Sequence, residues 1–103
     1  MSASGTENAS GGKAPDACDT VTICNQRGLH ARAAAKFVKL AALYDAEVEV
    51  ERNDMIVSGQ SIMGLMMLGA GKGSTITVEA EGWDAREALD GVAGLIEAGF
   101  HED

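Results

Sequence analysis

The segment Gly28-Leu29-His30-Ala31-Arg32 contains the side chains best suited to chemistry. His30 stands where a glycine-containing loop gives way to an alanine-rich stretch, so we expect it at or near a helix N-cap. The free N–H groups and the dipole of a helix N-terminus attract an anion and disfavour a proton on the imidazole. Arg32 would lie in the first helical turn, where its charge opposes the dipole unless it grips an anion such as phosphate.

This arrangement favours transfer chemistry, in which His30 accepts a chemical group from one molecule and donates it to another. No carboxylate pair and no serine or cysteine nucleophile accompanies His30 in the segment. A neutral imidazole beside an anion cradle is therefore interpreted as the site of a transient phosphohistidine. The alternative is an ordinary surface histidine at the start of a helix.

A second segment, Ser61 to Leu68, reads SIMGLMML and predicts a short helix. At 100° per residue Leu65 and Leu68 share the side that faces the core. The other apolar side chains cover the opposite arc: Ile62, Met63, Met66 and Met67. A short helix that is apolar all round cannot be buried all round in a small domain, so we expect an adaptable surface for partners. Burial under the N-terminal tail or in a dimer contact is the alternative.

Ser61 precedes this helix, and its simplest role is that of an N-cap. A phosphate on Ser61 would satisfy the helix N-terminus and would place about two negative charges beside the apolar arc. Such a modification would weaken partner docking without unfolding the domain.

The remaining sequence predicts the elements that position these two segments. Alternating apolar residues predict strands at 20–24, 47–51, 55–58 and 75–80, and helical periodicity predicts helices at 31–44, 62–68 and 84–98. The order β-α-β-β-α-β-α favours an α+β open-faced sandwich, in which a four-stranded antiparallel sheet carries three helices on one face. The other face is expected to be solvated through Thr20, Thr22, Glu47, Glu49, Glu51, Thr75, Thr77 and Glu79.

Composition indicates one ordinary globular domain, with 46% apolar and 23% charged residues among 103. Residues 1–19 are small and polar, and we expect a flexible tail there. Residues 20–100 are expected to form the domain, and residues 101–103 a C-terminal tail.

The net charge of −8 argues against binding to nucleic acid or to an anionic membrane surface. The sequence shows no membrane-spanning run and no secretory signal, so we expect a cytoplasmic protein without membrane insertion. Cys18 and Cys24 are expected to be free thiols, and no zinc spacing is present, so we expect no metal and no cofactor. The turn GAGKGST resembles a nucleotide-binding loop only superficially, because Gly73 stands where that motif needs Ser or Thr.

From about Asp19 to Phe100 the sequence resembles the phosphocarrier protein HPr family of the bacterial phosphoenolpyruvate-dependent phosphotransferase system. Three segments carry the resemblance in order: GLHARAAAKFV around His30, SGQSIMGLMMLG around Ser61, and GSTITVEAEG before the last helix. The resemblance implies the strand order 1-4-2-3. It also implies a carrier rather than an independent catalyst.

In this family the histidine accepts a phosphoryl group on Nδ1 from enzyme I and passes it to enzyme IIA domains, and His30 matches that residue. Arg32 matches the phosphate-contacting arginine, and Ser61 the serine targeted by the HPr kinase/phosphorylase. The docking surface corresponds to Ile62, Met63 and Met66.

The sequence departs from the family pattern at two points near His30. Ala33 stands where a proline is common after the arginine, which predicts lower rigidity rather than loss of function. Arg27 adds a second cation, expected either to strengthen phosphate and partner binding or to be solvated.

A second hypothesis is a regulatory binding module of the nitrogen-related branch, which would act through phosphorylation-gated contacts rather than in sugar transport. His30 together with Arg32 argues against a relative that has lost the carrier site. We expect a monomer.

Overall fold

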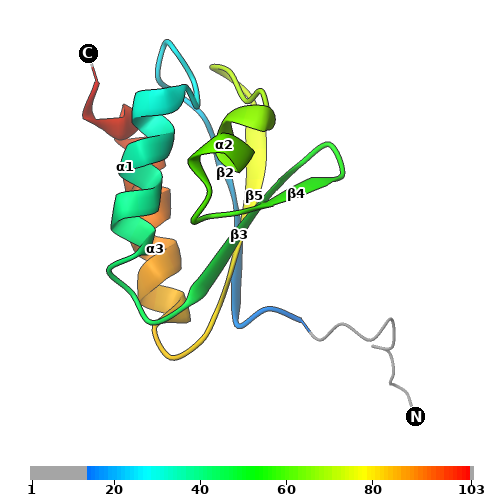
Figure 1. Cartoon of the computed structure of the whole chain (residues 1–103), viewed down its shortest axis with the longest axis vertical. Helices are drawn as coiled ribbons and strands as arrows, with labels where there is room; N and C mark the ends of the chain where they lie inside the picture. The colour runs from blue at the N-terminus through cyan, green and yellow to red at the C-terminus, as the bar shows by residue number, and fades with distance from the viewer. Residues whose placement is uncertain (1–13, 103) are drawn as a thin grey trace.

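The computed structural model describes residues 14–102, and these form one layer of helices on one sheet (Figure 1). The elements are β2 (Ala17–Thr22), α1 (Ala31–Ala41), β3 (Glu47–Arg52), β4 (Met55–Ser58), α2 (Ile62–Met67), β5 (Thr75–Glu81), α3 (Ala85–Glu97) and the 3₁₀ helix η1 (Gly99–His101). None of the helices in residues 14–102 is long and apolar enough to cross a membrane.

The sheet has the strand order β2-β5-β3-β4, and every pairing is antiparallel. The register places Val21 opposite Ile76, and it places Val50 between Val78 and Val57. Because side chains alternate across a strand, this register puts these valine and isoleucine side chains on one face. The predicted order 1-4-2-3 and the open-faced α+β architecture are confirmed.

The two faces of the sheet differ as the sequence predicts. In β3 the glutamates Glu47 and Glu49 are exposed, whereas Val48 and Val50 are buried. In β5 the buried positions are Ile76, Val78 and Ala80. The core lies between this face and the helices, and its largest fully buried side chains are Phe37, Phe100, Ile23, Leu65, Ile76, Leu89, Ile96, Val50, Val78 and Val92.

The two ends of the chain are more ordered than their composition predicts. The expected tail of residues 1–19 is too long, because Ala17–Asp19 pair with Val78–Ala80 of β5 and Ala17 is only 4% exposed. Backbone pairing holds these residues although their side chains are small or polar. The part of the predicted tail before residue 14 lies outside the described residues.

The expected C-terminal tail at 101–103 is also wrong where the structure describes it. Phe100 is fully buried, His101 belongs to η1, and the Glu102 side chain contacts His30. Asp103 lies outside the described residues. Burial of the phenyl ring therefore fixes the end of the chain to the domain.

Candidate functional site

His30 is the N-cap of α1, as the sequence predicts. Its backbone is extended (φ −78°, ψ −179°), and its Nδ1 accepts a hydrogen bond from the Arg32 N–H at 3.3 Å. Its carbonyl oxygen accepts the first intrahelical bond, from the Ala34 N–H at 2.8 Å. The imidazole thus sits at the positive end of the helix with its Nδ1 turned toward the first amides.

The loop before His30 is fixed by the turn after α2. The Leu29 N–H donates to the Ala70 carbonyl oxygen at 2.9 Å, and Leu29 is buried. Gly28 has a φ of +66°, and a Cβ there would lie 2.5 Å from the same oxygen. Only glycine fits both requirements, which explains the glycine two residues before His30.

The C-terminal residue Glu102 holds the other side of the imidazole. Its Oε2 lies 2.6 Å from His30 Nε2, and its Oε1 accepts a bond from Asn25 Nδ2 at 3.0 Å. The hydrogen bond from Asn25 is the main cause that lowers the pKa of Glu102. Desolvation opposes this shift, and the contact with His30 and the positive charge of Lys36 add to it. Figure 1 shows the C-terminal segment beside the start of α1.

These contacts assign different roles to the two ring nitrogens. Nδ1 accepts the Arg32 N–H, so the proton of a neutral His30 resides on Nε2, from which it is donated to Glu102. Nδ1 therefore carries the unprotonated electron pair and is the ring nitrogen that can act as a nucleophile. The sequence indicated the helix field and the arginines near His30 but not the carboxylate, because Glu102 is 72 residues away along the chain.

Cationic side chains gather on one side of the histidine, around its partner Glu102. A hollow of about 340 Å³ beside it is lined by Gln26, Arg27, Arg32, Lys36, His101 and Glu102. Arg27 and Arg32 are exposed, and within residues 14–102 neither guanidinium makes an ion pair. Because a guanidinium binds an oxyanion through paired N–H groups, the hollow suits a phosphate group.

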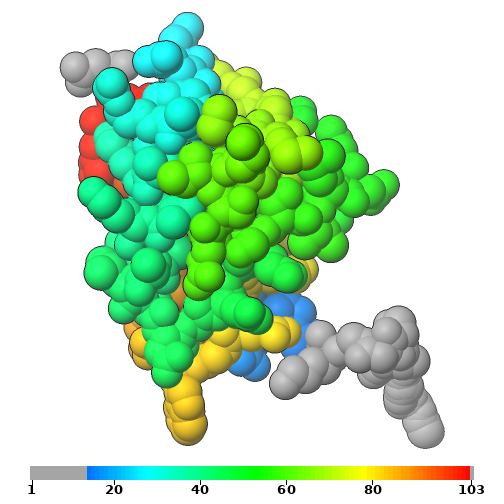
Figure 2. Space-filling model, viewed as in Figure 1, coloured from blue at the N-terminus to red at the C-terminus, as the bar shows by residue number. Residues whose placement is uncertain are grey.

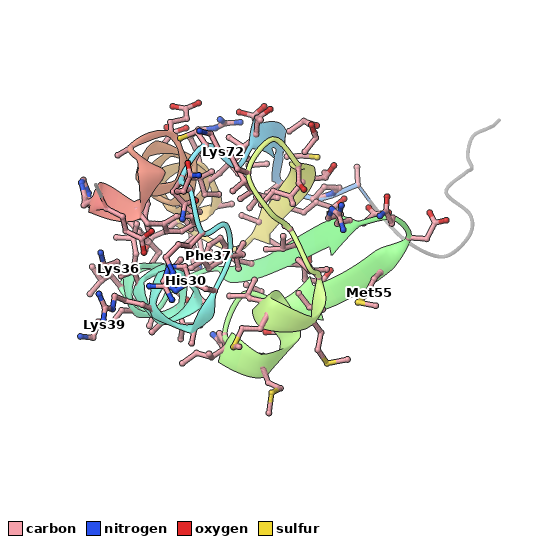
Figure 3. The ribbon with its side chains drawn as sticks, turned by 90° about the horizontal axis from the view of Figure 1, so that it is seen from above. His30, Lys36, Phe37, Lys39, Met55 and Lys72 are labelled. Carbon is pink, nitrogen blue, oxygen red and sulfur yellow. The ribbon has the colours of Figure 1, made fainter. Side chains whose placement is uncertain are left out.

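Lys36 has a structural role in addition to its charge. Its Nζ donates to the Phe100 carbonyl oxygen at 2.7 Å and so ties η1 to α1. Figure 3 shows His30 over the start of α1, close to Lys36 and far from Met55 on the other side of the molecule.

The second predicted segment also forms as expected. Ser61 is the N-cap of α2, and its Oγ accepts a bond from the Gly64 N–H at 2.9 Å. Leu65 and Leu68 are buried. The arc predicted to be accessible is exposed: Ile62 by 41%, Met63 by 70%, Met66 by 41% and Met67 by 65%.

The structure brings the two segments together on neighbouring elements. α1 and α2 are in contact, and Figure 2 shows them side by side on one face of the molecule. The imidazole at the start of α1, whose side chain is 17% exposed, and the exposed apolar arc of α2 thus lie on neighbouring helices.

The structure also bears on the state of the cysteines and on metal binding. Cys18 and Cys24 are both free and exposed, and Cys24 Sγ donates to the Ile96 carbonyl oxygen at 3.3 Å. Among residues 14–102 no three histidine, cysteine or carboxylate side chains are grouped so that they could hold a metal ion.

Comparison with known proteins decides the family. Residues 17–98 match the model of the PTS-HPr family, described as the PTS HPr component phosphorylation site. The chain belongs to the HPr family. HPr proteins are phosphocarriers of the phosphotransferase system, not catalysts, and this general role extends to the present chain.

Relatives named HPr and NPr are similar to this chain to nearly the same degree. Phosphocarrier protein NPr of Shewanella violacea is 48% identical over 80% of this chain and 90% of its own length. Phosphocarrier protein HPr of Cupriavidus necator is 49% identical over 79% of this chain and 91% of its own length.

A solved HPr structure has the same fold. HPr from Thermoanaerobacter tengcongensis superposes with a TM-score of 0.81 at 40% identity, covering 84% of this chain and 98% of the other. The match to the family model ends at residue 98, so Glu102 lies beyond it.

Proposed function

We propose that this HPr accepts a phosphoryl group on His30 Nδ1 from phosphorylated enzyme I and passes it to an enzyme IIA domain in the cytoplasm. The observation that carries the proposal is the division of roles in the imidazole. Nδ1 faces the N-terminal amides of α1, while Nε2 is held by Glu102 at 2.6 Å.

The transfer needs no acid or base from this chain. The electron pair of Nδ1 forms the new N–P bond as the N–P bond to the donor breaks, and the proton on Nε2 stays in place. In the reverse direction the pair returns to Nδ1 when the phosphoryl group leaves for the acceptor. Positioning and charge therefore dominate, as expected for phosphoryl transfer.

The cations of the hollow hold the transferred group. We assign the phosphate contact to the guanidinium of Arg32, a residue whose backbone N–H already donates to His30 Nδ1. Arg27 lines the same hollow and contributes to binding of phosphate and of partners. Their attraction is screened by solvent because both side chains are exposed, so the phosphoryl group is held without being trapped.

Incubation with phosphoenolpyruvate and enzyme I tests this function. Acid-labile phosphate is expected on the wild type and is expected to be absent from His30→Ala. The matched control is His101→Ala, which removes the other histidine of the chain and is expected to keep the label. Phosphorus and nitrogen NMR should place the group on Nδ1; labelling of His30→Ala would contradict the proposal.

The apolar arc of α2 is the proposed docking surface for enzyme I, enzyme IIA domains and the HPr kinase/phosphorylase. Its support is the exposure of Ile62, Met63 and Met66 beside the His30 site. Met63→Glu is expected to weaken all of these partners if they share one surface. Selective loss of one partner would show separate surfaces.

We further propose that phosphorylation of Ser61 regulates this docking. The hydroxyl already caps α2, so a phosphate would keep the cap while adding about two negative charges beside the arc. Ser61→Asp is expected to slow phosphorylation of His30 by enzyme I. Ser61→Asn is the matched control, because asparagine caps as well as aspartate but adds no charge; equal rates for the two variants would contradict the charge argument.

The branch of the system is set by the acceptor. Relatives named HPr and NPr match this chain almost equally, so sequence similarity does not choose between the sugar-transport role and the nitrogen-related regulatory role. Measuring phosphoryl transfer from this protein to purified IIA domains of each branch separates the two roles. The net charge of −8 opposes self-association, which supports a monomeric carrier. Sedimentation equilibrium tests that state.

A further inference from the structure

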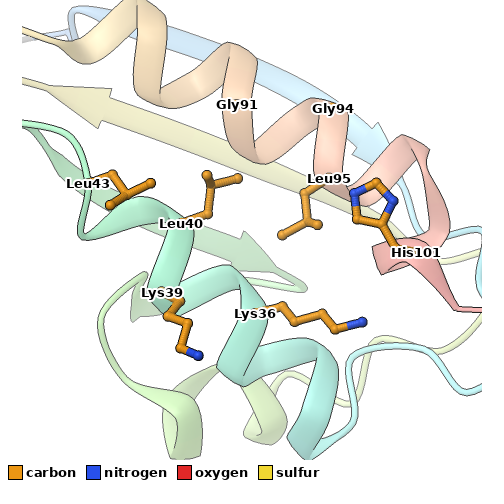
Figure 4. A pocket seen from close by; sticks show the side chains of 8 residues that line it. All are labelled: Lys36, Lys39, Leu40, Leu43, Gly91, Gly94, Leu95 and His101. Carbon is orange, nitrogen blue, oxygen red and sulfur yellow. The ribbon is translucent and has the colours of Figure 1, made fainter.

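A shallow groove of about 610 Å³ runs between α1 and α3 (Figure 4). Leu40 of α1, Leu43 just after α1 and Leu95 of α3 extend into it. The groove is separate from the apolar arc of α2, and phosphoryl transfer at His30 gives it no role. It is therefore a surface that the carrier function does not explain.

The groove is open because one helix lacks side chains where it would be filled. Gly91 and Gly94 of α3 line it. A Cβ at Gly94 would meet nothing within 4 Å, whereas a Cβ at Gly91 would lie 2.7 Å from the Tyr44 hydroxyl oxygen, so the open space lies at Gly94. Glycine in a helix costs about 1 kcal/mol relative to alanine. Leu43, at the end of the groove, is 76% exposed, so apolar surface is left in water next to a space that another chain can enter.

The rim of the groove has the opposite charge to the protein. Its charged lining residues are Lys36 and Lys39, which lie there with His101, and the described lining residues include no carboxylate. The chain as a whole carries −8. An acidic partner would be repelled by most of the protein surface and attracted to the lysines at the rim of the groove. The charge of the rim therefore favours an acidic partner at this location.

The shape fits a helix better than a small molecule. α1 and α3 contain 11 and 13 residues, which corresponds to about 16–20 Å of groove at 1.5 Å per residue. Small ligands are usually buried by 70–90% or more in deep pockets, whereas this groove is shallow. A third helix laid against two others packs its side chains between them.

We propose that the α1–α3 groove binds an acidic amphipathic helix of a partner protein. Leucine-like side chains of that helix contact Leu40, Leu43 and Leu95, and its carboxylates pair with Lys39 and with the ammonium of Lys36. Lys36 and His101 line both this groove and the hollow beside His30. The bound helix therefore lies next to the phosphoryl site without covering the arc of α2.

Calorimetric titration of the full chain with a synthetic peptide of about 15 residues, three to four helical turns, tests the proposal. The peptide has leucines at i, i+4, i+7 and i+11 and glutamates on the flanks, and a scrambled peptide of the same composition is the reference. Binding at least tenfold tighter for the amphipathic peptide is expected. Amide shifts should change at Leu43, Gly91 and Gly94 and stay constant in α2.

Three variants separate the groove from other surfaces. Gly94→Gln fills the groove while improving helix propensity, so loss of binding cannot be attributed to unfolding. Leu43→Ser and Lys39→Glu remove the apolar contact and the charge at exposed positions. Each is expected to weaken binding of the peptide at least fivefold, with Gly94→Gln melting at or above the wild-type temperature and the other two close to it. Met63→Ser on α2, the matched control, should bind the peptide as the wild type does.

Several results would overturn the proposal. Equal affinity for the scrambled peptide would show non-specific attraction, and insensitivity to Gly94→Gln would place binding elsewhere. Dimerisation of the chain that Gly94→Gln abolishes would make the occupant a second copy. Saturable binding of decanoate, lost in Gly94→Gln and competing with the peptide, would make the groove a site for a small amphiphile.

Discussion

Asn25 offers the sharpest test of how the two ends of the chain build the His30 site. The residue is 5% exposed, and its Nδ2 donates to the Gly28 carbonyl oxygen at 2.8 Å and to Glu102 Oε1 at 3.0 Å. Both partners are acceptors, so the orientation of the amide is determined by the network. Asn25→Asp keeps the shape but removes both donors and places a carboxylate against Glu102.

The expected loss of stability follows from these contacts. Leaving the buried Gly28 carbonyl oxygen without a donor costs about 1–3 kcal/mol, and repulsion from Glu102 adds to this. One kcal/mol corresponds to roughly 4–8 °C in a domain of this size, so the melting temperature should fall by roughly 5–20 °C.

The pH dependence of the stability of Asn25→Asp gives an independent test, because its direction can be predicted. Burial and the neighbouring Glu102 should raise the pKa of the new carboxyl above the usual aspartate value of about 3.9. The folded variant then binds a proton more readily than the unfolded chain, so its stability should fall as pH rises through this range. Urea unfolding at several pH values measures this slope.

Gln26→Glu is the matched control for this experiment. It makes the same amide-to-carboxylate change at the next, exposed position, where the side-chain oxygen already accepts from Lys72 Nζ at 3.2 Å. Its stability should stay within about 0.5 kcal/mol of the wild type. If Asn25→Asp were as stable as Gln26→Glu, the contact of Asn25 with Glu102 would have no energetic role and the reasoning would be refuted.

Three further predictions concern the same end of the molecule. Gly28→Ala should lose more than about 2 kcal/mol in denaturant unfolding, because a left-handed φ costs about 1–2 kcal/mol and the new Cβ would clash with Ala70; an unchanged midpoint would contradict this. Because the pKa of Glu102 is lowered in the folded protein, its contribution to folding is present above the ordinary value of 4.5 and is lost as pH falls through the lowered value. The NMR shifts of the Asn25 side-chain amide should report this titration. If these shifts changed only above pH 4.5, the lowered pKa would be contradicted. Phe100→Ala should cost about 3–5 kcal/mol because the ring is fully buried, and a smaller loss would mean that η1 is not anchored by this ring.

Local sequence patterns determined most of the fold. Alternation of glutamate and valine in 47–51 identified a strand with one solvated face, because side chains of a strand point alternately to its two sides. Helical spacing identified α1, α2 and α3. The N-cap roles of His30 and Ser61 also followed from sequence, since capping depends on residues within one turn.

The predicted ends of strands and helices were less accurate where contacts with other elements, rather than the local sequence, determine where an element begins or ends. β2 begins at Ala17 rather than at residue 20, because β5 offers backbone partners to residues whose own side chains give no strand signal. α1 ends at Ala41 rather than 44, although Leu43 and Tyr44 extend the helical pattern. The residues after Ala41 turn toward β3 instead.

The sequence by itself determined which atoms can do chemistry: an imidazole at a helix start, arginines nearby and a serine before an apolar helix. Tertiary structure alone decided what completes the site. Glu102 meets His30 across 72 residues because Phe100 is buried and Lys36 binds its carbonyl oxygen. The cationic groove likewise arises only when α1 and α3 pack side by side, because contacts between distant segments depend on the whole core and leave no periodic signal along the chain.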